Sequence, residues 1–182
     1  MKLIYNYKEI IKIYKNDYNL KKAINKKEIY KLEKGIYSNK KIVSPLIIYS
    51  KKYPNAVITM DSAFYYYNLT DVIPNKVYLA TDRNSDKINN SKIIQSFVAK
   101  SILNEGKVIL EENGEKINIY DRERLLIELI RKKKQIPFDY YKEIISNYRA
   151  IVDELDMYKI EEYLALFKNE LNLSNILQIE VF

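Results

Sequence analysis

Residues 53–81, YPNAVITMDSAFYYYNLTDVIPNKVYLAT, carry the clearest structural pattern in the chain. They predict a buried strand, a capped helix, a turn and a second buried strand. Thr59 and Asp61 can accept hydrogen bonds from the free N–H groups that begin a helix. Asn68 tolerates the left-handed backbone that often ends a helix. Val77–Thr81 then alternates as half-buried strands do, so strands and a helix are expected to share one domain.

The chain beyond this stretch predicts a strand, a hairpin and several helices. Ile93–Val98 is a strand candidate, and Lys107–Glu111 and Lys116–Tyr120 flank an Asn-Gly pair that suits a tight hairpin turn. Asp121 is the expected N-cap of a helix over 122–132. Two amphipathic helices follow at 139–152 and 156–168, and a last short element begins at Ser174. Together with the first stretch, these elements predict an α+β domain with C-terminal helices.

The first 44 residues predict a winged helix-turn-helix domain. Helices are expected at 7–15, 20–24 and 26–34, followed by a small hairpin of Ile36-Tyr37 and Ile42-Val43. In this arrangement the third helix enters the major groove of DNA and the hairpin, or wing, follows the backbone. The expected DNA-binding residues are Lys26, Lys27, Tyr30, Lys31, Lys34, Lys40 and Lys41.

The positive charge of the chain is concentrated near its N-terminus. The first 52 residues contain 14 lysines and 4 acidic residues, a net charge of +10, whereas the remainder has a net charge of −3. A lysine-rich helix is also compatible with an ordinary solvated face, but clustering on this scale favours an anion-binding module. We expect a domain boundary near Ser44-Pro45, which separates a DNA-binding domain at 1–44 from an α+β domain at 45–182.

The residue types that are missing exclude several kinds of chemistry. The sequence has no cysteine and no histidine, so disulfides, thiol nucleophiles, histidine bases and Cys/His metal sites are excluded. Its three glycines form no phosphate-binding loop. No secretory signal and no apolar run long enough to cross a bilayer are present. We expect a cytoplasmic protein with no metal, no cofactor and no membrane contact.

Two motifs resemble those of a known family. The first spans Tyr53–Ala80 and contains Tyr-Pro-x-Ala-Val-Ile-Thr, then Ser-Ala, Leu-Thr, a proline and Val-x-Leu-Ala. The second is Asp-Arg-Glu-Arg at 121–124, followed by an apolar run. Over most of its length the chain resembles the AbiEi-type antitoxins, the DNA-binding halves of type IV toxin–antitoxin (abortive infection) systems. The family-like residues are Thr59, Ser62, Ala63, Glu123 and Arg124.

The resemblance implies a function as well as a fold. Such an antitoxin binds double-stranded operator DNA, represses its own operon and opposes a nucleotidyltransferase-like toxin without forming a stable complex with it. It usually begins with a winged helix-turn-helix domain, and Leu32, Gly35 and Tyr37 resemble residues at the end of that domain. The resemblance gives the chain no catalytic role. A stand-alone winged-helix transcriptional regulator remains the alternative within the same broad class.

An enzyme is the alternative from a different class. Asp121 and Glu123 could suggest a metal-dependent nuclease of phage defence, but such a centre needs a Glu-x-Lys on a following strand, which the sequence lacks. Helix capping explains both carboxylates more simply. Tyr65–Tyr67 could stack on bases, yet their expected place on a helix of the near-neutral domain favours packing.

Overall fold

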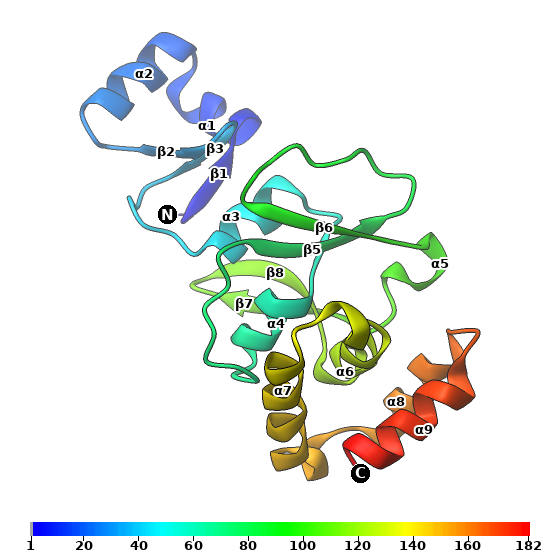
Figure 1. Cartoon of the computed structure of the whole chain (residues 1–182). Helices are drawn as coiled ribbons and strands as arrows, with labels where there is room; N and C mark the ends of the chain where they lie inside the picture. The colour runs from blue at the N-terminus through cyan, green and yellow to red at the C-terminus, as the bar shows by residue number, and fades with distance from the viewer. Residues whose placement is uncertain (1) are drawn as a thin grey trace. The chain divides into compact units, whose positions relative to one another are not determined.

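The protein divides into two compact units, which are described separately. The structure is a computed structural model and describes residues 2–182. The first unit runs to Ala56 and includes Ile109–Asn118, and the second consists of Val57–Val108 and Ile119–Phe182. Figure 1 shows helices together with two separate sheets, so the predicted α+β class is confirmed. The division differs from the boundary predicted at Ser44-Pro45.

The first unit is built on a three-stranded antiparallel sheet with the strand order β1-β3-β2. Its elements are β1 (Ile4–Asn6), α1 (Tyr7–Tyr14), α2 (Asp17–Asn25), β2 (Tyr30–Glu33), β3 (Ile36–Ser38) and α3 (Pro45–Lys52). Tyr5 of β1 lies opposite Tyr37 of β3, and both pack in a core with α1 and α2. Helix α3 contacts β1 and β3, which explains why it belongs to this unit.

Side-chain caps determine where the helices of the first unit begin, and a shared core determines which face they bury. Asn6 accepts a hydrogen bond from the Glu9 N–H and Glu9 returns one to the Asn6 N–H, which is a capping box. Asn16 caps α2 by accepting from the Asn19 N–H. The buried apolar residues that these helices and the sheet share are Tyr5, Ile10, Leu20, Ala23, Ile29 and Tyr37.

The third predicted helix, at 26–34, is wrong. Lys27 has a positive φ of 59°, so the chain turns after α2 and then enters strand β2. Ile29 is buried, but it reaches the core from this turn and not from a helix. The predicted hairpin of Ile36-Tyr37 with Ile42-Val43 is also wrong, because β3 pairs with β1 and β2, and Ile42 is exposed.

A mixed sheet with the order β6-β5-β4-β8-β7 has most of its strands in the second unit and includes residues 109–118 of the first. Its strands are β4 (Val57–Ile58), β5 (Val77–Asp82), β6 (Ile93–Val98), β7 (Lys107–Glu112) and β8 (Glu115–Tyr120). Strand β4 is antiparallel to β5 and parallel to β8, and β5 is parallel to β6. The predicted strand at 93–98 and the Asn113-Gly114 hairpin are confirmed, although the outer part of that hairpin belongs to the first unit.

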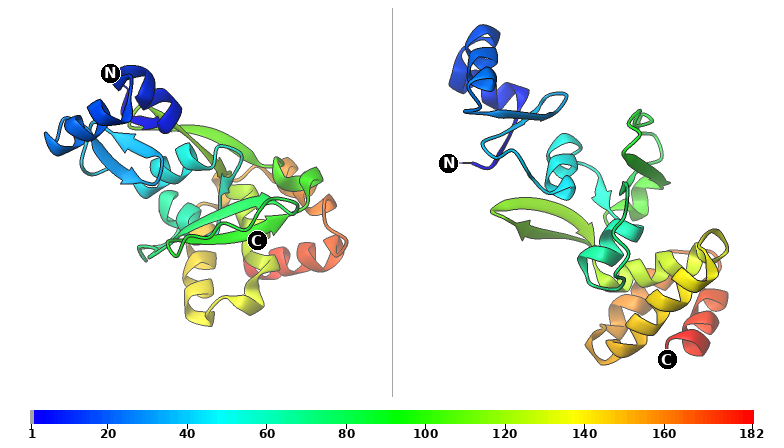
Figure 2. Two further views of the ribbon diagram at one scale, coloured as in Figure 1. Left: turned by 90° about the horizontal axis from the view of Figure 1, so that it is seen from above. Right: turned by 60° about the vertical axis from the view of Figure 1, so that its left-hand side comes forward.

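Helices accompany this sheet and continue into a C-terminal cluster that both views of Figure 2 show in yellow to red. They are α4 (Met60–Tyr66), α5 (Lys100–Leu103), α6 (Arg122–Arg131), α7 (Phe138–Ala150), α8 (Met157–Ala165) and α9 (Glu170–Glu180), with short 3-10 turns η1 (Lys133–Gln135) and η2 (Val152–Glu154). Asp121 caps α6 as predicted, by accepting from the Arg124 N–H. Helix α9 begins four residues before the predicted element at Ser174. Over residues 2–182, none of these helices has the length and apolar character needed to cross a membrane.

Candidate nucleic-acid interface

Helix α2 presents one polar face to solvent. Leu20 and Ala23 are buried in the core of the first unit, which fixes the rotation of the helix. The opposite side then carries residues at the spacing i, i+3, i+4 and i+7, which form a single stripe. These exposed residues, which we call the α2 face, are Tyr18, Lys21, Lys22 and Asn25.

Only two residues, Lys15 and Asn16, connect α1 to α2. Lys15 has a positive φ of 69° and its N–H donates to the carbonyl of Ile11, so the chain reverses sharply at the end of α1. Asp17, in the first turn of α2, accepts a hydrogen bond of 2.9 Å from the Tyr7 hydroxyl. This hydrogen bond raises the pKa of Tyr7 and links the starts of the two helices.

Most lysines of the first unit are exposed and unpaired. Lysines on α1, on α2, in the turn after α2, on β2 and in the loops flanking β3 all point to solvent. Between residues 2 and 52, the ten that make no ion pair with any residue from 2 to 182 are Lys8, Lys12, Lys15, Lys21, Lys22, Lys27, Lys31, Lys34, Lys40 and Lys41. A surface with this many uncompensated cations produces a positive potential that attracts polyanions.

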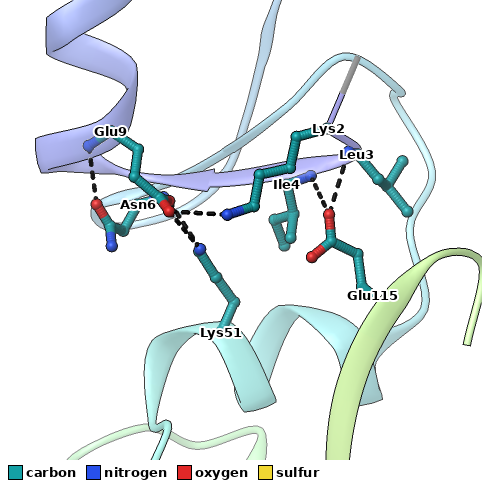
Figure 3. Close-up of polar contacts among 7 residues, drawn as sticks. All are labelled: Lys2, Leu3, Ile4, Asn6, Glu9, Lys51 and Glu115. Atoms are coloured by element: carbon teal, nitrogen blue, oxygen red, sulfur yellow. Dashed lines mark hydrogen bonds and ion pairs between the residues drawn. The ribbon is translucent and has the colours of Figure 1, made fainter. Parts of the chain in front are cut away.

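Three other lysines near the sheet form ion pairs with two carboxylates. Glu9 accepts from Lys2 Nζ at 2.8 Å and from Lys51 Nζ at 2.7 Å, and Lys52 pairs with Glu33 at 3.1 Å. Figure 3 shows Glu9 between the two lysines that contact it. Burial alone would raise the pKa of Glu9, but these hydrogen bonds and the Asn6 N–H lower it to about 2. This cluster holds the unit together and adds little to its positive potential.

A second carboxylate in Figure 3 covers the outer edge of strand β1. Glu115, at the tip of the β7–β8 hairpin, accepts from the backbone N–H groups of Leu3 at 3.1 Å and Ile4 at 3.2 Å. An edge strand leaves such groups open to pairing with another chain. The Glu115 side chain therefore satisfies two donors that the sheet itself leaves free.

The structure separates the predicted DNA-binding residues into two groups. Tyr30 lies opposite Ser38 in the β2–β3 pair, so Lys26 and Lys27 precede β2 at the end where Lys40 and Lys41 follow β3. Lys34 lies in the turn at the other end of this hairpin. It follows Tyr30 by four residues, which corresponds to about 13 Å at the rise per residue of a strand. Lys31 lies between the two ends. The seven residues therefore follow one hairpin and do not lie on a common helix.

The α2 face was missed by the sequence prediction, although its signal is present in the sequence. Asn16 and Asp17 are typical of a helix start, and Leu20, Ala23 and Ile24 have helical spacing. Recognising this start would have extended the predicted helix at 20–24 back to Asp17. Tyr18, which is 75% exposed, would then have been assigned to the same face as Lys21.

The family-like residues Thr59, Ser62 and Ala63 are all buried in the second unit. Thr59 occupies the N-cap position of α4 as predicted, but its side chain makes no capping hydrogen bond. The Ser62 hydroxyl accepts from the Tyr78 N–H at 2.9 Å and thereby joins α4 to β5. Ala63 is fully buried.

The other two family-like residues, Glu123 and Arg124, are also buried. Glu123 accepts from the Asp156 N–H at 3.0 Å, just before α8. The Arg124 guanidinium pairs with Glu128 at 2.9 Å and lies 5.1 Å from the ring centres of both Tyr120 and Phe167. Glu128 is therefore the carboxylate partner of the buried Arg124.

The two family-like motifs come together in the fold. Strands β4 and β8 are parallel neighbours, with Ile58 opposite Ile119, and each is followed directly by the helix that carries its motif. Helices α4 and α6 then pack against each other. Because all five side chains are buried here, their arrangement supports a role in stabilising the second unit.

Comparison with known proteins assigns no family to the chain. In the part of the chain that the structure describes, no group of three or more acidic side chains is arranged to hold a metal ion. No protein-family model matches the sequence, and no curated protein is significantly similar to it.

Proposed function

We propose that the protein is a DNA-binding antitoxin of the AbiEi type, which represses its own operon and opposes a nucleotidyltransferase-like toxin. One observation carries the DNA-binding part of this proposal: the exposed, unpaired lysines of the first unit include two on the α2 face. The antitoxin part rests on the resemblance of the two motifs. We propose no catalytic role.

The order of elements in the first unit supports a winged-helix-like domain. Strand β1, helices α1 and α2 and strands β2 and β3 follow one another, and β1 pairs with β3. In a helix-turn-helix the second helix of the pair reads the major groove. In this proposal α2 takes that role, in place of the segment 26–34, and the turn at Lys34-Gly35 is a short wing.

The chemistry of the α2 face suits this role. Lys21 and Lys22 supply charge for phosphates, while Tyr18 and Asn25 supply hydrogen-bonding groups for phosphates or base edges. Asp17, the acidic residue of α2, accepts a hydrogen bond from the Tyr7 hydroxyl. Lys31 and Lys34 on the hairpin would add backbone contacts, which position a protein without reading sequence.

Fluorescence anisotropy with the protein's own promoter DNA, measured over a range of salt concentrations, tests the assignment. The double variant Lys21→Glu, Lys22→Glu should bind far more weakly, because it removes two phosphate contacts and adds repulsion. Replacing each contacting lysine by glutamine should reduce the slope of log affinity against log salt concentration by about 0.9. The variant Lys27→Gln, Lys31→Gln examines the hairpin in the same way.

The matched control is Lys87→Glu, Lys168→Glu, which makes the same charge change at exposed lysines of the second unit. It should bind promoter DNA nearly as the wild type does. Unchanged binding by the Lys21→Glu, Lys22→Glu protein would reject α2 as the DNA-contacting helix. Co-expression with the product of the neighbouring gene tests the antitoxin role, and failure of the folded full-length protein to rescue growth would reject it.

A further inference from the structure

A cavity of about 200 Å³ opens in the second unit. Tyr78 of β5 and Ile94 and Ser96 of β6 line one side of it. Tyr78 is in register with Ile94 and Ala80 with Ser96, so these three residues share a face of the parallel pair. The start of α4, the end of α6 and the start of α7 supply the other walls.

A half-buried lysine from the end of α6 lines this cavity. Lys132 Nζ donates to the Ser96 hydroxyl at 3.2 Å, and the lysine makes no ion pair with any residue between 2 and 182. Burial lowers its pKa, although Glu128 and Asp61 attract its charge. An ammonium group in a partly dry site gains strongly from an added anion.

A carboxyl group from the start of α4 lines the same cavity. Asp61 interacts with the hydroxyl of Tyr78, another residue of the lining. Burial raises the pKa of Asp61, and no cation of residues 2–182 lies within ion-pair distance of it. The cavity therefore contains one positive and one negative side chain that attract each other without forming an ion pair.

Two further features distinguish this cavity from ordinary packing defects. The Tyr140 hydroxyl is buried and makes no hydrogen bond of normal geometry to the described residues, although Thr70 lies close enough to influence its pKa. Met60, also in the lining, has a positive φ of 46° that a side chain of its kind rarely adopts. Unsatisfied polar groups and strained backbone are concentrated at ligand sites in proteins.

We propose that this cavity binds a small zwitterion of amino-acid size, with its cationic group toward Asp61 and its anionic group toward Lys132. A neutral ligand would leave both side chains without a counter-charge, and a simple anion would compensate only the lysine. The volume equals that of about seven water molecules, which suits a small amino acid. Ile94, Ile136 and Pro137 offer apolar walls for its side chain. The site is independent of the proposed DNA binding.

Thermal unfolding and calorimetric titration of the full-length protein with glycine, L-alanine, L-serine, L-threonine and L-valine test the proposal. At ten times its Kd, a bound amino acid should raise the Tm by about 3 to 5 °C. Propionate and ethylamine, which are L-alanine without its amino or its carboxyl group, should each bind at least about tenfold more weakly than L-alanine. Absence of binding by every amino acid, or equal binding by propionate, would overturn it.

Three variants locate the site. Lys132→Met and Asp61→Asn should each weaken the binding of the amino acid at least about tenfold. Lys134→Met changes an exposed lysine two residues away and should bind as the wild type does. If Lys132→Met bound the amino acid normally, the assignment would be wrong. If a variant failed to fold, the comparison of L-alanine with its two truncated analogues on the wild-type protein would decide the question.

Discussion

Removal of the two members of the buried Arg124–Glu128 pair should have unequal effects on stability. Both side chains are inaccessible, with 0% of Arg124 and 5% of Glu128 exposed. Glu128 has a second cation, because Arg131 also contacts its carboxylate at 2.9 Å. Within residues 2–182, Arg124 has no anion other than Glu128, and its Nε and Nη1 atoms have no hydrogen-bond partner. Loss of Glu128 therefore leaves a buried charge uncompensated, whereas loss of Arg124 does not.

The magnitudes follow from these contacts. Glu128→Gln should lower the free energy of unfolding by about 3 kcal/mol, the lower end of the range for a broken buried pair, because the amide oxygen still accepts one hydrogen bond. Arg124→Met should cost about 1 to 2 kcal/mol. It loses the contacts of the guanidinium with Tyr120 and Phe167, but the methionine fills much of the space and needs no counter-charge.

Urea unfolding followed by far-UV circular dichroism measures both effects, and hydrogen exchange of α6 identifies the transition that contains the pair. Glu154→Gln serves as a control, because it removes an exposed ion pair with Arg122 and should cost under about 1 kcal/mol. An Arg124→Met protein that is destabilised as much as Glu128→Gln, or more, would refute the reasoning.

Two further predictions concern single contacts of the fold. The pKa of Glu9 is lowered to about 2 in the folded protein, so its ion pairs stabilise above pH 4.5 and this contribution is lost as the pH falls toward 2. The free energy of unfolding should therefore decrease between pH 7 and pH 3 by about 1 kcal/mol less in Glu9→Gln than in the wild type or in the exposed control Glu28→Gln. Equal decreases would contradict this prediction. Gly106 has a φ of +75°, and a Cβ there would lie 2.4 Å from the Cβ of Arg124, so Gly106→Ala should lower stability by more than about 2 kcal/mol. Gly114→Ala, at a φ of +78° with no atom within 4 Å of its added Cβ, should cost about 1 kcal/mol, and similar Tm values for the two variants would exclude the close contact.

The parts of the fold that were predictable depend on local signals. The Asn-Gly turn, the capping aspartate at 121 and the apolar pattern of 122–132 each lie within a few residues, and all three elements are present. The partner of Arg124 was readable too, because Glu128 lies four residues later on the same helix.

The failures involve strand pairing and contacts that form only in the folded protein. Ile29 and Leu32 have helical spacing, yet Tyr30–Glu33 becomes a strand because β3 supplies its hydrogen bonds. Strand β3 is itself paired with β1, a strand of three residues that is too short to show alternation. The cavity in the second unit could not be predicted from the sequence either, since Asp61, Ser96 and Lys132 approach one another only in the folded protein.

The contact between Glu115 and strand β1 makes the first unit discontinuous in the chain. Translation proceeds from the N-terminus, so β1, α1 and α2 leave the ribosome long before residue 115 does. Until then the N–H groups of Leu3 and Ile4 lack the carboxylate that covers them. A nascent chain therefore exposes an open strand edge, and completion of the first unit has to wait for synthesis of the β7–β8 hairpin.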